Sequence, residues 1–171
     1  MRLYHDASSN RLIIKFVKTG HNIAARQFLA ELMEGCQAVG ITRKDFYAIG
    51  SGRHECATNR SKEPDESFKQ RATRPYYDDK PTLAVEIDFS ARLKQLRNDA
   101  DFWLTHTNRQ VKVVILIHIN RDNKSLHIEQ WQMQSTYRPA KAQNFDIVSN
   151  NGAISVQPEV PLRISMTFCL T

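Results

Sequence analysis

Three carboxylates in the middle of the chain have the types and spacing that suit metal chemistry. Asp65 lies in the polar segment KEPDESF (62–68), and Glu86 and Asp88 stand at the end of the apolar segment TLAVEID (82–88). The period of a β-strand puts Glu86 and Asp88 on one face, and burying such carboxylates is costly unless they meet water, a cation or a metal. If the loop that carries Asp65 packs beside this strand, the three groups converge on a hard divalent cation such as Mg²⁺. Metal-assisted phosphodiester hydrolysis is the chemistry that we expect of such a site.

Basic side chains surround the acidic segments and could follow the phosphates of a nucleic acid, although a solvated surface is the alternative. They are Lys62, Lys69, Arg71, Arg74, Arg92, Lys94 and Arg97. The 171-residue chain has a formal net charge of +6, which makes an anionic partner more plausible because bound cations release the counterions of the phosphates. Each acid also has a structural alternative: Asp65 as a turn residue that caps its own backbone, and Glu86 as the partner of a helix arginine such as Arg97.

The elements that must position these residues follow from the hydrophobic pattern. We expect strands over 11–17, 45–50, 53–57, 82–88, 111–119 and 125–133, a short extended piece at 66–68, a last strand within 161–170, and loops over 58–80 and 135–151. A Gly-Ser-Gly turn predicts that 45–50 and 53–57 form a hairpin, and 111–119 and 125–133 form another. Apolar residues at helical spacing predict helices over 22–39 and, after a cap at Ser90, over 93–104. The expected fold is α/β (α+β), a central mixed sheet flanked by helices, in one domain over 1–171.

Other classes of function lack their signatures in this sequence. The three cysteines are odd in number and show no CxxC spacing, which argues against disulfides and thiolate zinc and favours a reducing intracellular compartment, nuclear or cytoplasmic. No apolar run is long enough to span a bilayer, and the start shows no secretory signal, so we expect no membrane role. The histidines form no HExxH-type pair; His118 and His127 should be cross-strand neighbours that pack or hydrogen-bond.

The spacing of Asp65 and Glu86, with PD followed by an acid on an apolar strand, resembles the PD-(D/E)XK nuclease superfamily. The runs KEPDESF, PTLAVEIDFSARLKQLRNDADFWL and VKVVILIHINRDNKSLHIEQW are similar to a group of fungal members related to the Uma2-like branch. The resemblance covers roughly residues 11–131. It implies a restriction-endonuclease-like core, Asp65 and Glu86 as ligands of Mg²⁺ or Mn²⁺ with Asp88 beside them, and a nucleic acid, preferably DNA, as the partner, with a homodimer as an option.

The chain departs from the superfamily at one position. Two residues after the second acid the pattern has a lysine, and this chain has Asp88. Lys94 on the following helix is the candidate substitute that would activate water. Two functions therefore remain open: a metal-dependent nuclease that uses Asp65, Glu86, Asp88 and Lys94, and an inactive domain of the same fold that binds nucleic acid or protein.

Overall fold

The fold consists of two β-sheets and two α-helices in a computed structural model that describes residues 2–6, 11–15, 19–89, 93–135 and 138–165. The larger sheet has seven strands, which are in spatial order β11 (Ala153–Gln157), β10 (Arg138–Asn150), β9 (Ser125–Ser135), β8 (Val113–Asn120), β7 (Leu83–Asp88), β6 (Glu66–Gln70) and β3 (Phe46–Ala48). The smaller sheet has the order β2 (Arg11–Lys15), β1 (Arg2–Asp6), β5 (Arg60–Lys62) and β4 (His54–Cys56). The helices are α1 (Thr19–Ala38) and α2 (Leu93–Thr105), and a short 3₁₀ turn covers Ala57–Asn59.

All neighbouring strands are antiparallel except β7 and β8, which α2 connects in parallel. Parallel strands need such a crossover because a short hairpin cannot join them. β7 is buried at five of its six residues and β8 at its first five, as expected for strands that are covered on both faces. The predicted mixed sheet with flanking helices is therefore confirmed.

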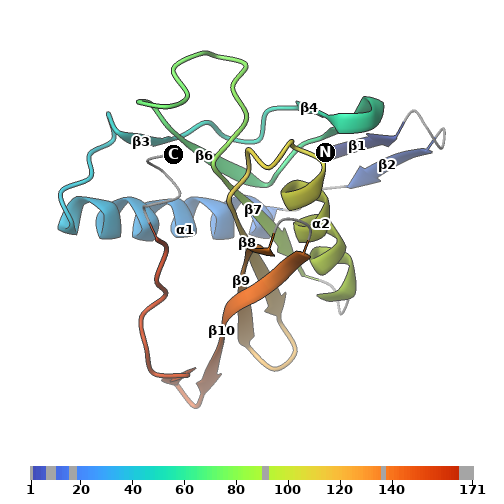
Figure 1. Cartoon of the computed structure of the whole chain (residues 1–171). Helices are drawn as coiled ribbons and strands as arrows, with labels where there is room; N and C mark the ends of the chain where they lie inside the picture. Colours follow the sequence, from blue (N-terminus) through green and yellow to red (C-terminus); the bar gives the residue numbers. More distant parts are fainter. Residues whose placement is uncertain (1, 7–10, 16–18, 90–92, 136–137, 166–171) are drawn as a thin grey trace.

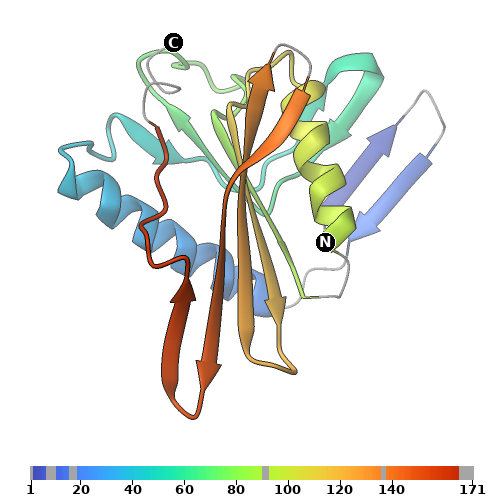
Figure 2. The ribbon, with the colours of Figure 1, turned by 60° about the horizontal axis from the view of Figure 1, so that its bottom comes forward.

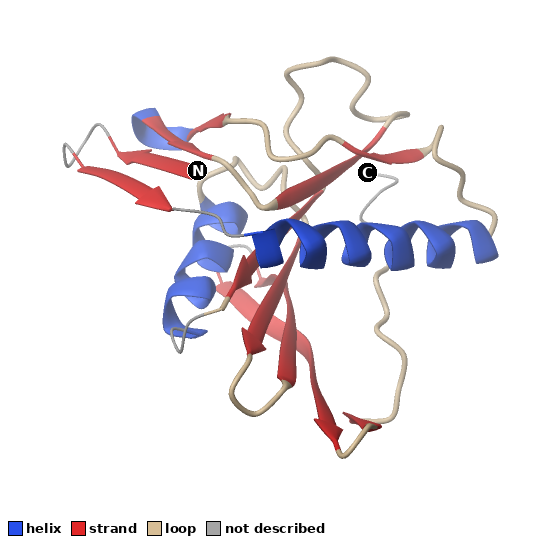
Figure 3. Cartoon of the chain, turned by 180° about the vertical axis from the view of Figure 1, so that it is seen from behind, coloured by secondary structure: helices blue, strands red, loops and turns tan. Residues whose placement is uncertain are grey.

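The two helices lie on opposite faces of the larger sheet (Figures 1 and 3). On the α1 face, Leu83, Val85 and Ile87 of β7 pack with side chains of α1, of β8 and of the β3–β6 pair. On the α2 face, Ala84 packs with Trp103 and its apolar neighbours from α2 and β8. Alternate residues of β7 thus serve two separate cores, and Glu86, with the same parity as Ala84, belongs to the α2 face.

The smaller sheet and the long hairpins extend away from this centre. β1 and β2 project beside α2, whereas β10 and β11 form a hairpin at the far edge of the larger sheet (Figure 2). Among the described helices, none is long and apolar enough to cross a membrane.

Three expectations about the elements were wrong. The segments around β3 and β4 do not form a hairpin, because β3 pairs with β6 in the larger sheet and β4 pairs with β5 in the smaller one. The expected loop over 135–151 contains β10, a polar strand that the backbone ladder with β9 holds in place. In the expected last strand, residues 161–165 are not extended in a sheet, and the remainder lies outside the described residues, as does the Ser90 cap.

Candidate functional site

Glu86 is held in the core between β7 and α2. Its side chain is almost fully buried, with the residue 2% exposed, and its Oε1 accepts a hydrogen bond of 2.7 Å from the indole Nε1 of Trp103. The Nζ of Lys62 lies 3.4 Å from the same oxygen. A buried carboxylate is tolerated when a cation and a hydrogen-bond donor compensate it, and here β5 and α2 supply the two partners.

Lys62 reaches this carboxylate from the smaller sheet. It is buried, its Nζ also hydrogen-bonds to Asp99 of α2, and the ammonium lies 5.6 Å and 5.8 Å from the ring centroids of Phe102 and Trp103. Burial alone would lower the pKa of Lys62, but the charges of Glu86 and Asp99 outweigh it and raise that pKa above its ordinary value. Lys62 is therefore charged, and one cation serves two carboxylates while it ties β5 to β7 and α2.

Asp65 is brought against β7, as the sequence argument requires, but it acts there as a backbone cap. It is 4% exposed, and its Oδ2 accepts a hydrogen bond of 2.7 Å from the amide of Ile87. Its own amide donates to the carbonyl of Val85 at 3.0 Å. The side chain thus extends the β6–β7 ladder, and Asp65 caps the neighbouring strand.

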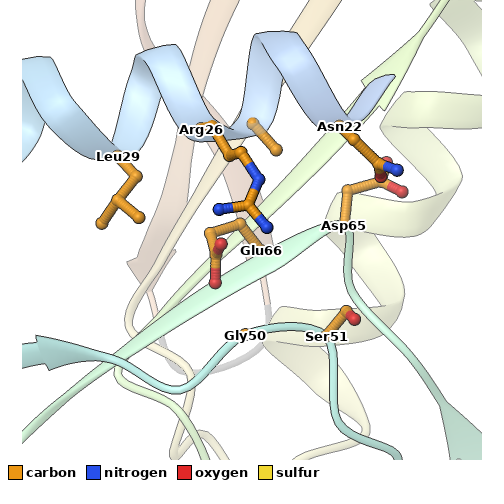
Figure 4. Close-up of a pocket in the computed structure, with 8 residues that line it drawn as sticks. Asn22, Arg26, Leu29, Gly50, Ser51, Asp65 and Glu66 are labelled. Atoms are coloured by element: carbon orange, nitrogen blue, oxygen red, sulfur yellow. The ribbon is translucent and has the colours of Figure 1, made fainter. Parts of the chain in front are cut away.

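Asp65 also borders a pocket of about 320 Å³ on the α1 side of the sheet (Figure 4). The lining comes from one face of α1, from the turn after β3 and from the start of β6: Asn22, Ala25, Arg26, Leu29, Gly50, Ser51, Asp65 and Glu66. Glu86 does not line this pocket, because its contacts are with Trp103 and Lys62 on the α2 side. The two acids that the sequence pairs therefore have different surroundings.

The remaining predicted residues are dispersed. Asp88 is partly exposed and its Oδ1 accepts a hydrogen bond of 2.9 Å from the amide of Phe89, while Lys94 is exposed on α2. Lys69 is buried, and its Nζ donates to the carbonyl oxygen of Tyr76. Arg92 lies outside the described residues.

Arg97 belongs to a network that the sequence argument did not find. Its guanidinium makes two hydrogen bonds to the fully buried Glu129 of β9, Nη2 to Oε1 at 2.6 Å and Nε to Oε2 at 3.1 Å. The indole of Trp131 donates to Oε2 at 2.8 Å, and Lys141 Nζ lies 3.4 Å from Oε1. Burial raises the pKa of Glu129, but the hydrogen bonds from Arg97, His127 and Trp131 prevail and lower it to about 2.

His127 links the network around Glu129 to β10. Its Nε2 lies 3.1 Å from Glu129, its Nδ1 lies 2.6 Å from Asp146 of β10, and it pairs in register with His118 of β8, as predicted. The alternation of residues 125–133 could have placed Glu129 beside His127 and Trp131. Nothing local in the sequence points to Arg97 as its partner, because that contact crosses from a helix to a strand.

Within the described segments, no three His, Cys, Asp or Glu side chains are grouped so that they could hold a metal ion. No known protein family matches the chain, and no curated protein is detectably similar to it.

Proposed function

We propose that this chain is a domain of the PD-(D/E)XK nuclease class that binds nucleic acid without cutting it. The observation that carries the proposal is the pairing of Glu86 with Lys62 and Trp103 in a buried core. The resemblance implies that Glu86 binds the metal. In this structure, Oε1 of Glu86 instead lies beside the ammonium of Lys62 and accepts a hydrogen bond from the indole of Trp103. The position that should supply the catalytic lysine is Asp88.

The surroundings of the acids do not fit a Mg²⁺ site made from Asp65, Glu86 and Asp88. Mg²⁺ requires near-ideal octahedral geometry and oxygens that are free to turn toward it. One oxygen of each acid already accepts a hydrogen bond: Asp65 Oδ2 from the amide of Ile87, Glu86 Oε1 from the indole of Trp103 and Asp88 Oδ1 from the amide of Phe89. A metal that bound Oε1 of Glu86 would have to displace Lys62, whose ammonium would then lose one of its two carboxylates in a buried site.

A nucleic acid is the favoured partner because of the chain's charge. The formal net charge of +6 supplies the sequence-independent part of such binding, which depends on salt through the release of counterions. The structure has a mixed sheet with a helix on each face, and this arrangement agrees with the architecture that the resemblance implies.

The metal-dependent nuclease is the second candidate, and one observation favours it. Asp65 and Glu66 line the pocket beside α1 together with Arg26, so carboxylates and a cation surround an open space next to β7. In this candidate Asp65 would bind the metal, and Lys94 would have to approach from α2.

Cleavage of plasmid DNA and of single-stranded RNA, with Mg²⁺ and with Mn²⁺, separates the two candidates. The wild type and the variants Asp65→Asn and Glu86→Gln are compared at equal folded concentration, checked by circular dichroism. We expect no cleavage above the buffer control, together with retained binding of nucleic acid in the presence of a chelator. Cleavage that the wild type performs and folded Asp65→Asn lacks would overturn the proposal, and equal cleavage by all three proteins would identify a contaminant.

A further inference from the structure

Two tyrosines protrude from the connection between β6 and β7. Tyr76 is 71% exposed and Tyr77 is 101% exposed, so most of the surface of Tyr76 and all of that of Tyr77 face solvent. Exposed aromatic side chains of this size usually find cover in a folded protein or are used in recognition. The connection rises above the end of β6 and the beginning of β7 (Figure 1).

The connection that carries the tyrosines is firmly anchored. The buried Lys69 donates a hydrogen bond of 2.5 Å to the carbonyl of Tyr76, and Asp79 Oδ2 accepts one of 2.7 Å from the Tyr76 amide. Arg74 donates to the carbonyl of Lys80 at 2.8 Å and to that of Gln110 at 2.6 Å. Because these hydrogen bonds hold the backbone on both sides of the tyrosines, the exposure of the two side chains is a property of the fold. A ligand that binds them therefore has to order less of the chain than it would in an unanchored loop.

Three connections meet at this end of the larger sheet. The amide of Arg71 donates to the carbonyl of Asp45 in the α1–β3 connection at 2.9 Å, and Arg74 bonds to Gln110 in the α2–β8 connection. The segments 39–45, 71–82 and 106–112 together contain seven Lys and Arg residues and three Asp residues: Arg43, Lys44, Arg71, Arg74, Lys80, Arg109, Lys112, Asp45, Asp78 and Asp79. We call this group the basic end. Its excess of four positive charges is most of the chain's +6.

The acids of the basic end are partly engaged within the fold. Asp45 Oδ2 accepts hydrogen bonds from the amide and the hydroxyl of Thr42, at 2.9 Å and 2.7 Å, and Asp79 caps the turn at Tyr76. Among the cations, the guanidinium of Arg71 lies 5.0 Å from the ring centroid of Tyr47, which holds it against the surface. Because seven cations stand against three carboxylates, the field that reaches solvent at this end is positive.

We propose that the basic end is the binding site and that its ligand is a single-stranded nucleic acid, with Tyr76 and Tyr77 stacking on bases and the surrounding cations following the phosphates. This inference rests on the proposed function and assigns it a place and a class of ligand. Exposed aromatic rings recognise unpaired bases because only unpaired bases offer a free π-face, whereas a paired duplex presents mainly its phosphates to such a surface. The site lies at the opposite end of β7 from Asp88, which is consistent with binding that does not involve the acidic residues.

Fluorescence anisotropy with the full chain tests the proposal. The probes are labelled oligothymidylate and oligouridylate of about 15 nucleotides and a duplex of the same length, in a chelating buffer at several salt concentrations. We expect tighter binding of the single strands than of the duplex. The variant Tyr76→Ala/Tyr77→Ala should bind the single strands about tenfold more weakly or worse, with little change for the duplex.

A charge-matched pair of variants locates the site. Lys44→Gln/Arg71→Gln removes two cations from the basic end, and Lys124→Gln/Arg138→Gln removes two exposed cations from β9, β10 and their turns. Only the first pair should lower the slope of log affinity against log salt, by about 1.4 for two phosphate contacts on a single strand. The exposed positions of all six substitutions leave the core untouched, and circular dichroism checks that each variant is folded.

Each outcome bears on a separate statement. Absence of binding by the wild type overturns the proposed function and this inference together. Binding that is as tight for the duplex, or that the tyrosine variant and the Lys44→Gln/Arg71→Gln pair leave unchanged, overturns only the inference and leaves a nucleic-acid-binding domain with its site elsewhere. The comparison of thymidylate with uridylate separates DNA from RNA as the source of the single strand.

Discussion

Glu86 and Glu129 lie on the same face of the larger sheet, and the contrast between them explains what the α2 face does. They flank Leu116 in register, one on β7 and the other on β9, and each accepts a hydrogen bond from an indole, Trp103 or Trp131. The cation beside Glu86 is Lys62, whose side chain is 7% exposed, whereas the cation beside Glu129 is Arg97, whose side chain is 43% exposed. The resemblance implies that Glu86 is a catalytic residue. Its contacts, however, are of the same kind as those of Glu129, a carboxylate that holds a strand and a helix together.

The difference between the two sites lies in how readily the cation can return to water. Arg97 and Lys141 are at the rim and can be hydrated without Glu129. Lys62 is enclosed by two aromatic rings and two carboxylates, so loss of its partners leaves an uncompensated charge in the core. We therefore expect changes at the Glu86 site to cost more stability than equivalent changes at the Glu129 site.

The largest effect should come from Lys62→Met. This variant leaves Glu86 and Asp99 without their shared cation and should lower the free energy of unfolding by about 3–5 kcal/mol, because breaking a buried pair strands the remaining charge. Urea denaturation followed by circular dichroism measures it. The double variant Lys62→Met/Glu86→Gln should lose less than the sum of the two single variants, and simple additivity would show that the two groups do not interact.

The pH dependence should separate the two sites. The pKa of Glu129 is about 2 in the folded chain and about 4.5 when unfolded, so its contribution to stability is complete above pH 4.5 and is lost as pH falls toward 2. Lys62 has a raised pKa, so its contribution is complete below about pH 10.5 and is lost as pH rises above that value. Denaturation midpoints measured at acid pH and at alkaline pH give the two limbs of the stability profile, the acid limb and the alkaline limb. The acid limb should flatten in Glu129→Gln and the alkaline limb in Lys62→Met, and an exchange of these assignments would refute the comparison.

A smaller effect is expected from Glu129→Gln at neutral pH. The amide oxygen can still accept from Arg97 or Trp131, and the partly exposed cations can be hydrated, so the loss should be about 1–2 kcal/mol. Urea denaturation beside Glu86→Gln gives the comparison directly. A larger loss for Glu129→Gln than for Glu86→Gln would mean that burial of the cation does not control the cost.

The smallest effect should come from Asp88→Lys, which supplies the lysine that the nuclease pattern requires. Asp88 is partly exposed, so stability should change by about 0.5 kcal/mol or less. No cleavage of DNA with Mg²⁺ or Mn²⁺ is expected, because Glu86 remains bound to Lys62 and Trp103. Metal-dependent cleavage by this variant would show instead that Glu86 can leave its partners, and that the missing lysine alone inactivates the domain.

The sequence by itself determined the elements whose patterns are strong. The amphipathic stripe gave α2, the apolar run gave β7, and the alternation of residues 125–133 gave β9 and its pairing with β8. It also named the packing of the Asp65 loop beside β7 as the condition for an acidic site, and the structure places Asp65 there, with its carboxylate on the amide of Ile87. These successes rest on local periodicity, which the backbone geometry of helices and strands imposes on each segment separately.

Only the tertiary structure decided which partners the charged residues have. β4 and β10 were missed or misplaced because a short or polar strand is stabilised by pairing with distant segments rather than by its own pattern. Likewise, Glu86 is paired with Lys62 from another sheet and Glu129 with Arg97 from a helix, and hydrogen bonds join the connection that carries the tyrosines to the α1–β3 and α2–β8 connections. Such contacts depend on how elements pack in space, so a sequence can nominate a charged residue, whereas the fold determines whether that charge is neutralised within the core or faces solvent.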